Sequence, residues 1–127
     1  MANEILIAAS ISASKGGGSV SGSMSTYLTL TGSEMIATVQ TISTAVAAVP
    51  IGGCDQIQAI MIKNMPLLSD GVTANTATIT VGLDNPITQT VAVIPPGGAA
   101  LIPGANTTLY WKASAGTPDG MVVAVEN

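Results

Sequence analysis

The chain has 127 residues, of which 47% are hydrophobic and only 8% are charged, and its net charge is −4. Soluble domains usually carry about 25% charged residues, so this chain has few charges with which to keep an apolar surface in solution. It is long enough for one domain with a hydrophobic core.

The missing residue types exclude several classes of function. There is no His and no Arg, and the aromatic residues amount to 2%. Nucleic-acid binding relies on a basic surface and on aromatic side chains that stack on bases. Without His, neither His-based catalysis nor a His-ligated metal is available. The single cysteine, Cys54, excludes an internal disulfide framework and a Cys-rich zinc site.

The N-terminal segment alternates small, apolar and hydroxyl side chains with the period of a strand. Residues 4–13 predict a first strand, and residues 19–31 predict a second. Between them, Lys15–Gly18 (KGGG) predicts a turn. On the first strand one face would carry Ile5, Ile7, Ala9 and Ile11. On the second, Ser21, Ser23 and Ser25 would share a polar face unless a bulge near Gly22 shifts the register.

The middle of the chain continues the strand pattern. Residues 35–49 predict one or two strands, with a short helix over Thr41–Val49 as the alternative. Residues 57–64 (IQAIMIKN) are nearly all apolar, which predicts a central strand buried on both faces.

The second half alternates strands with turns that contain Gly or Pro. In residues 76–83 the threonines point one way, while Ala77, Ile79, Val81 and Leu83 point the other. Further strands are expected at 87–94, 100–102, 107–113 and 121–126.

About eight strands and no crossover helices predict an all-β fold, an antiparallel β-sandwich or jelly roll. We expect residues 1–30 to form a Ser/Gly-rich N-terminal arm or edge hairpin of the same unit, and residues 31–127 to form the sandwich domain.

The motifs that carry chemistry elsewhere have simpler interpretations here. In the KGGGS segment the Lys precedes the glycines and no helix follows, unlike a phosphate-binding loop. Asp70, Asp84 and Asp119 adjoin turn residues, so we expect their carboxylates to bond local backbone. Cys54 is expected to be a half-buried apolar residue. The sequence therefore predicts no enzyme, no catalytic residue, no cofactor and no metal.

The interface candidates lie in the arm and in the aromatic pair Tyr110-Trp111. The aromatic pair either seals the core or anchors an interface, since Tyr and Trp are enriched at binding hot spots. The candidates are Lys15, Ser19, Ser21, Ser23, Tyr110 and Trp111.

Neither a membrane span nor an export signal is predicted. The best candidate for a span, the charge-free window Met35–Cys54, is interrupted by hydroxyl residues and glycines, and Met1–Ala13 lacks the basic start of a secretory signal. We expect a cytoplasmic product whose apolar surface is covered by other subunits.

The order of several short segments resembles small virion structural proteins of tailed bacteriophages. In the first half these segments are Met1–Ile5, SASKGGGSVSGS (residues 12–23) and Val39–Thr44. In the second half they are Ile62–Asn64, Ile79–Asp84, Ile94–Gly97, Leu101–Pro103 and Met121–Glu126. Many members of that group carry Phe or Tyr where this chain has Ile60, Met61 and Ile62, so no specific contact is carried over.

The resemblance implies a structural component of a phage particle, assembled in the bacterial cytoplasm and located in the virion. The first expectation is a capsid decoration (cement) protein that binds the outer capsid surface and stabilises the lattice. It implies the major capsid protein or other virion proteins as partners, and a homo-oligomer, with a trimer as the expected state. The alternatives are a head-to-tail or tail-associated subunit, or a secreted bacterial surface or adhesin subunit.

Overall fold

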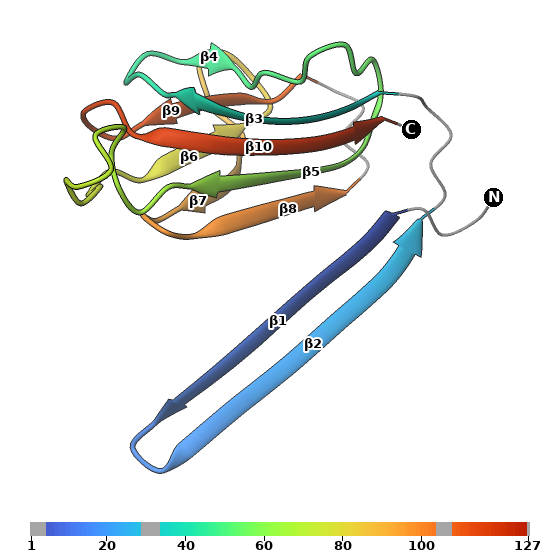
Figure 1. Ribbon diagram of the computed structural model, residues 1–127, viewed down its shortest axis with the longest axis vertical. Helices are drawn as coiled ribbons and strands as arrows, with labels where there is room; N and C mark the ends of the chain where they lie inside the picture. The colour runs from blue at the N-terminus through green and yellow to red at the C-terminus, as the bar shows by residue number, and fades with distance from the viewer. Residues whose placement is uncertain (1–4, 29–33, 104–107, 127) are drawn as a thin grey trace. The chain divides into compact units, whose positions relative to one another are not determined.

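The chain divides into two compact units, Met1–Thr31 and Gly32–Asn127. The computed structural model describes residues 5–28, 34–103 and 108–126. We call residues 5–28 the hairpin and the described residues from 34 to 126 the body (Figure 1). The sequence-based division placed the boundary after residue 30.

The hairpin consists of β1 (Ile5–Lys15) and β2 (Gly18–Leu28), paired antiparallel without interruption from Ile5↔Leu28 to Lys15↔Gly18. Gly16 and Gly17 form the turn with φ angles of 59° and 83°. Two successive positive φ angles define a type I′ turn, whose twist matches that of the strands and which glycine adopts without steric strain. The predicted turn is confirmed. No bulge occurs at Gly22, so the serines of β2 share one face.

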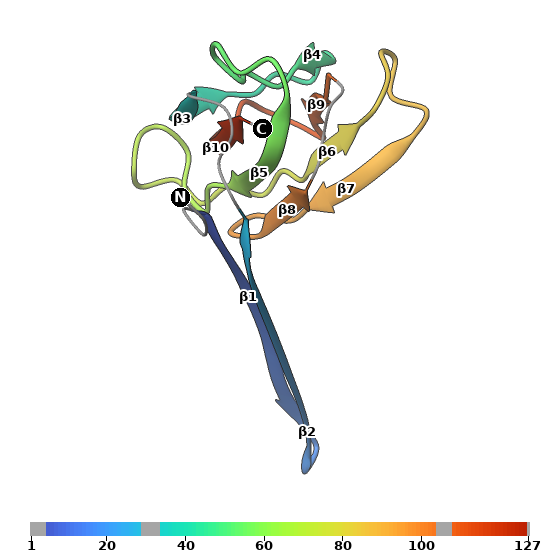
Figure 2. The same ribbon diagram turned by 90° about the vertical axis from the view of Figure 1, so that its right-hand side faces the viewer.

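The body contains two four-stranded sheets in which every strand pairs antiparallel with its neighbours. Sheet I has the order β3-β10-β5-β8, and sheet II has the order β4-β9-β6-β7 (Figures 1 and 2). The strands are β3 (Met35–Thr41), β4 (Ala47–Ala48), β5 (Ile57–Asn64), β6 (Ile79–Gly82), β7 (Thr90–Ile94), β8 (Ala99–Pro103), β9 (Tyr110–Ala113) and β10 (Asp119–Glu126). No helix occurs in the described residues, so the all-β prediction is confirmed.

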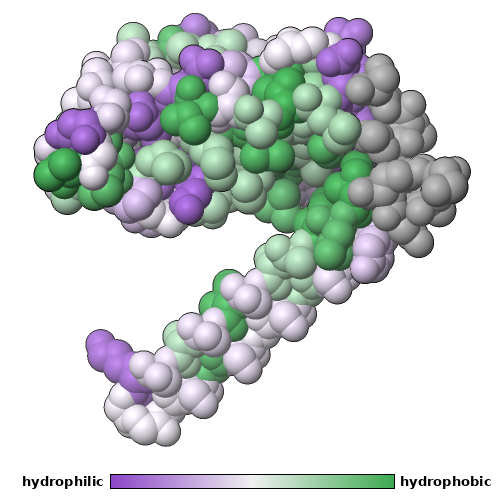
Figure 3. Space-filling model, in the orientation of Figure 1, coloured by the Kyte–Doolittle hydropathy of each residue, from purple (hydrophilic) through white to green (hydrophobic). Residues whose placement is uncertain are grey.

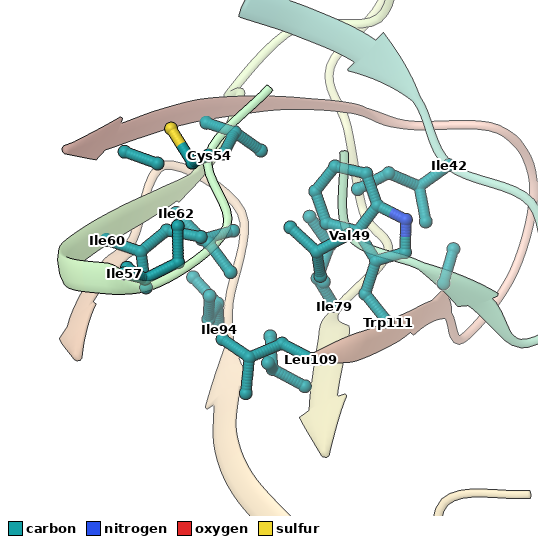
Figure 4. Packing of buried hydrophobic residues seen from close by; sticks show 14 residues of the cluster. Ile42, Val49, Cys54, Ile57, Ile60, Ile62, Ile79, Ile94, Leu109 and Trp111 are labelled. Atoms are coloured by element: carbon teal, nitrogen blue, oxygen red, sulfur yellow. The ribbon is translucent and has the colours of Figure 1, made fainter. Parts of the chain in front are cut away.

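One hydrophobic core lies between the two sheets. Sheet I contributes residues such as Ile62 and Val122, and sheet II contributes Ile79, Val81 and Trp111, all 3% exposed or less. Figure 4 shows the indole of Trp111 pointing into this cluster. The core residues follow the period-2 alternation of their strands, which places every second side chain on the inner face.

Two expectations about burial need correction. β5 is central, between β10 and β8, but its outward residues Met61 and Lys63 are only half-buried. No described element of the body covers that face. Leu83 was expected to point inward with Ile79 and Val81, yet it is 40% exposed. A register shift between Val81 and Gly82 ends the alternation there.

Candidate interaction surfaces

The hairpin has one apolar face. Because the pairing is regular, odd positions of β1 and even positions of β2 lie on the same side. Ile11, Val20 and Met24 on this face are 74%, 68% and 66% exposed. We define the apolar hairpin face by residues Ile5, Ile7, Ala9, Ile11, Ala13, Val20 and Met24.

The opposite face of the hairpin carries hydroxyl groups near the turn, and the exposed pair Leu6↔Tyr27 at the other end. Three cross-strand serine pairs line it: Ser10↔Ser23, Ser12↔Ser21 and Ser14↔Ser19. Of the predicted interface residues, Ser19, Ser21 and Ser23 all lie here and are exposed, whereas Lys15, an odd position of β1, is exposed beside the turn on the apolar side. Figure 3 shows apolar residues at intervals along one side of the hairpin and paler residues along the other.

A two-stranded hairpin of this kind is marginally stable in water by itself. Both of its strands are edge strands, so backbone N–H and C=O groups remain unpaired along each side. Burial of its apolar face against another surface would supply the stabilisation that two strands alone lack.

The second surface is the outer face of sheet I. The register aligns Val39 with Met121, Met121 with Lys63, and Met61 with Leu101 on this side. Met35, Val39 and Leu101 are 64%, 53% and 39% exposed. We define the apolar sheet face by Met35, Ala37, Val39, Met61, Ala99, Leu101, Met121, Val123 and Val125. Figure 3 shows apolar residues gathered over these strands.

Polar residues on the same side of sheet I are confined to one end. There, Thr41 lies opposite Asp119, and its hydroxyl donates to Asp119 Oδ1 over 2.9 Å. Lys63 lies on the same side, beside Met121. The remainder of the face offers a partner almost only hydrocarbon, which is unusual for a free protein surface.

The outer side of sheet II is more mixed. It carries Thr80, Lys112 and Tyr110, with Val93 on its edge strand β7. The pair Tyr110-Trp111 is split by strand alternation: Tyr110 is half-buried on the outer side, whereas Trp111 is 3% exposed in the core. Trp111 thus matches the core alternative, and its burial leaves no surface for a partner.

The acidic residues belong mainly to loops. Asp70 Oδ1 accepts from the backbone N–H groups of Val72 and Thr73 at 2.9 and 2.8 Å. Asp84 Oδ1 accepts from Thr88 and Gln89 at 2.7 and 3.0 Å. The turn prediction is therefore confirmed for these two. Asp119 instead accepts a hydrogen bond from the Thr41 hydroxyl on the neighbouring strand.

These hydrogen bonds perturb the carboxyl groups. The Thr73 hydroxyl, followed by the two N–H groups, lowers the pKa of Asp70. The Gln89 N–H, followed by the Thr88 hydroxyl and N–H, lowers the pKa of Asp84. Both effects arise because the donors stabilise the charged carboxylate.

Cys54 is a free thiol and only 4% exposed, which is deeper than the half-buried position expected. Burial raises its pKa, and the negative charges of Glu126, Glu34 and Asp55 raise it further. Nucleophilic chemistry needs a thiolate, so this environment opposes reactivity. Within residues 5–28, 34–103 and 108–126, no group of three or more His, Cys, Asp or Glu side chains is arranged to hold a metal ion.

No helix in the described part of the chain is long and apolar enough to cross a membrane. No family model matches the chain, and neither a curated protein nor a solved structure matches it.

Proposed function

We propose that this protein is a structural subunit of a bacteriophage particle, and specifically a capsid decoration protein that binds the outer surface of the shell. The observation that carries the proposal is the exposed apolar surface, on the hairpin and on sheet I, in a chain with 8% charged residues. Monomeric proteins rarely expose contiguous apolar patches above roughly a few hundred Å². Subunits of an assembly bury such patches against their neighbours.

The strand order of the body supports a jelly-roll topology. From β3 to β6 the chain alternates between sheets I and II, β6 and β7 are neighbours in sheet II, and the alternation then resumes through β8, β9 and β10. Two four-stranded antiparallel sheets connected in this way form the sandwich of two Greek keys that is common in viral capsid domains. This topology is compatible with the proposed role, and the sequence resemblance points in the same direction.

The charge distribution favours the outside of the shell. The body carries six carboxylates against two lysines, and the whole chain has a net charge of −4. Packaged DNA would repel such a chain electrostatically. A subunit that bridges neighbouring capsomers from outside adds contact free energy only in the assembled lattice. It thereby opposes the internal pressure of the packaged genome.

The test is the protein content of purified particles from a phage that encodes this chain. We expect the chain to be present in a fixed, high ratio to the major capsid protein when measured by quantitative mass spectrometry. Particles that lack it should release DNA at a lower temperature, and addition of the purified chain should restore the original release temperature.

Two results would overturn the decoration role. Absence of the chain from purified particles would remove the virion function altogether. A few copies per particle, located at the connector or tail, would replace the decoration role with the head-to-tail or tail-associated alternative.

A further inference from the structure

We propose that the apolar hairpin face of one copy packs on the apolar sheet face of a second copy. Both surfaces are exposed in the single chain, with Ile11 at 74% and Met35 at 64%. The inference rests on the proposed function only in requiring an assembly. It names the partner of the hairpin as another molecule of the same protein.

The two surfaces have compatible dimensions. Strands of 11 residues span about 37 Å, and two paired strands with their side chains are about 10 Å wide. The four strands of sheet I are spaced about 4.8 Å apart, so the sheet is broad enough to receive a two-stranded ribbon. Packing of these faces would make the hairpin a third layer on the body, with the interdigitated side chains typical of stacked sheets.

The charges favour the hairpin of a second copy, and not its body, as the part that covers the apolar sheet face. The described part of the hairpin carries one charge, Lys15, whereas the body has a net charge of −4 from six carboxylates and two lysines. Contact between two bodies brings like charges together, and contact between two hairpin tips brings two lysines together. Contact of a hairpin with a body avoids both repulsions.

The surface area that the contact would bury indicates that two copies exchange their hairpins. A contact about 25 Å long and 10 Å wide buries roughly 500 Å² when both partners are counted. Specific interfaces usually bury at least about 1,000 Å² in total. The contact of one hairpin therefore buries too little area for a stable interface. Two hairpins exchanged between two copies bury about the area that is needed. A ring in which each copy gives and receives one hairpin also uses every such surface.

Two matched pairs of substitutions test the contact. Ile11→Asp places a charge on the apolar hairpin face, and Ser12→Asp places the same charge on the serine face one residue away. Val39→Asp alters the apolar sheet face, and Val93→Asp alters a valine of similar exposure, 60% against 53%, on the edge strand of sheet II. We expect the first member of each pair to weaken self-association by roughly 30-fold or more, as for loss of a central interface contact. The second members should associate like the unmodified chain.

Sedimentation equilibrium measures the association, and far-UV circular dichroism checks that each variant remains folded. If Val39→Asp associates like the unmodified chain while Ile11→Asp does not, the hairpin binds elsewhere and the proposal is wrong. A monomeric unmodified chain also overturns it. If Ile11→Asp unfolds the hairpin, its loss of association says nothing about the contact. The Val39→Asp variant still tests the contact, because Val39 lies on the body.

Disulfide trapping identifies the occupant directly. A tagged Ile11→Cys chain is mixed with an untagged Val39→Cys chain and oxidised. Cys54, 4% exposed, remains out of reach. We expect the mixed dimer to exceed both homodimers, because the proposed contact brings position 11 of one copy, and not position 11 of both, onto the sheet that carries position 39. The double variant Ile11→Cys/Val39→Cys should form linked oligomers.

Two other disulfide-linked products would contradict the proposal. An intrachain disulfide in the double variant would show that the hairpin covers its own sheet, and predominant homodimers of Ile11→Cys would show hairpin-to-hairpin packing. These experiments use no phage particle, so their failure is separate from failure of the decoration role. Absence from particles would leave the hairpin–sheet contact standing.

Discussion

Asn75 Nδ2 donates a 2.6 Å hydrogen bond to Asn64 Oδ1 inside the body, where the two side chains are 5% and 0% exposed. Asn64 Nδ2 in turn donates to the backbone carbonyls of Ala77 and Ile94 at 2.8 and 3.0 Å. Ile94 belongs to sheet II and Asn64 to sheet I, so this amide joins the two layers. No buried side-chain N or O atom in the described ranges lacks a partner.

The first prediction concerns this amide. Asn64→Ala removes the hydrogen bonds to two buried carbonyls and one of the two made by the Asn75 amide, which keeps its bond to the Met65 carbonyl. We expect a loss of about 3 kcal/mol in the free energy of unfolding. Gln40→Ala on the same sheet is the control, because its exposed amide makes one 3.4 Å contact with Thr38. Urea unfolding measures both. Equal midpoints for the two variants would contradict the role assigned to Asn64.

The second prediction concerns the space at Gly120. A Cβ atom there would lie 2.6 Å from Ile42 Cδ1 and 3.0 Å from the Trp111 ring. Gly120→Ala should destabilise the body by about 1–3 kcal/mol through overpacking. At Gly53 the nearest atom would lie at 3.6 Å, so Gly53→Ala should change the thermal midpoint little. A Gly120→Ala midpoint equal to that of the unmodified chain would contradict this packing.

The third prediction concerns thiol reactivity. Burial, with Glu126, Glu34 and Asp55 nearby, raises the pKa of Cys54 and limits access to it. Labelling by a thiol reagent at pH 8 should be slow in the native chain and fast in urea. A Ser12→Cys variant, with an exposed thiol on the hairpin, should react rapidly without denaturant. Rapid native labelling of Cys54 would contradict its burial.

The fourth prediction concerns acid sensitivity. Hydrogen bonds donated by Gln89 and Thr88 lower the pKa of Asp84 in the folded chain. A lowered folded-state pKa stabilises the fold above the pKa of the unfolded chain, and this stabilisation is lost as the pH falls through the folded-state value. Asp84→Asn should therefore be less stable than the unmodified chain at pH 7, and the difference should shrink as the solution is acidified. A pH-independent difference in thermal midpoint would contradict the assignment.

Much of the strand pattern could be predicted from local sequence. The KGGG turn fixes the hairpin, because two glycines adopt the positive φ angles that a two-residue turn requires. The alternation in residues 76–83 correctly placed Ala77, Ile79 and Val81 inside. These features depend on neighbouring residues alone.

The pairing of distant strands was not available from the sequence. Alternation shows which side chains share a face, but it does not show that β10 lies between β3 and β5. The nearly continuous apolar pattern of β5 suggested cover on both sides, although Met61 faces outward and is half-buried. An apolar outer face and a covered one have the same sequence pattern, so the candidate surface on sheet I emerged only from the structure.

We propose that this protein works as an assembled subunit whose apolar faces are covered by neighbours. The most direct measurement is the native mass of the purified chain by light scattering on a sizing column at low and high salt. We expect a closed oligomer that persists at both salt concentrations, because apolar burial is not screened by ions as charge pairs are. A well-behaved monomer at both salt concentrations would contradict it.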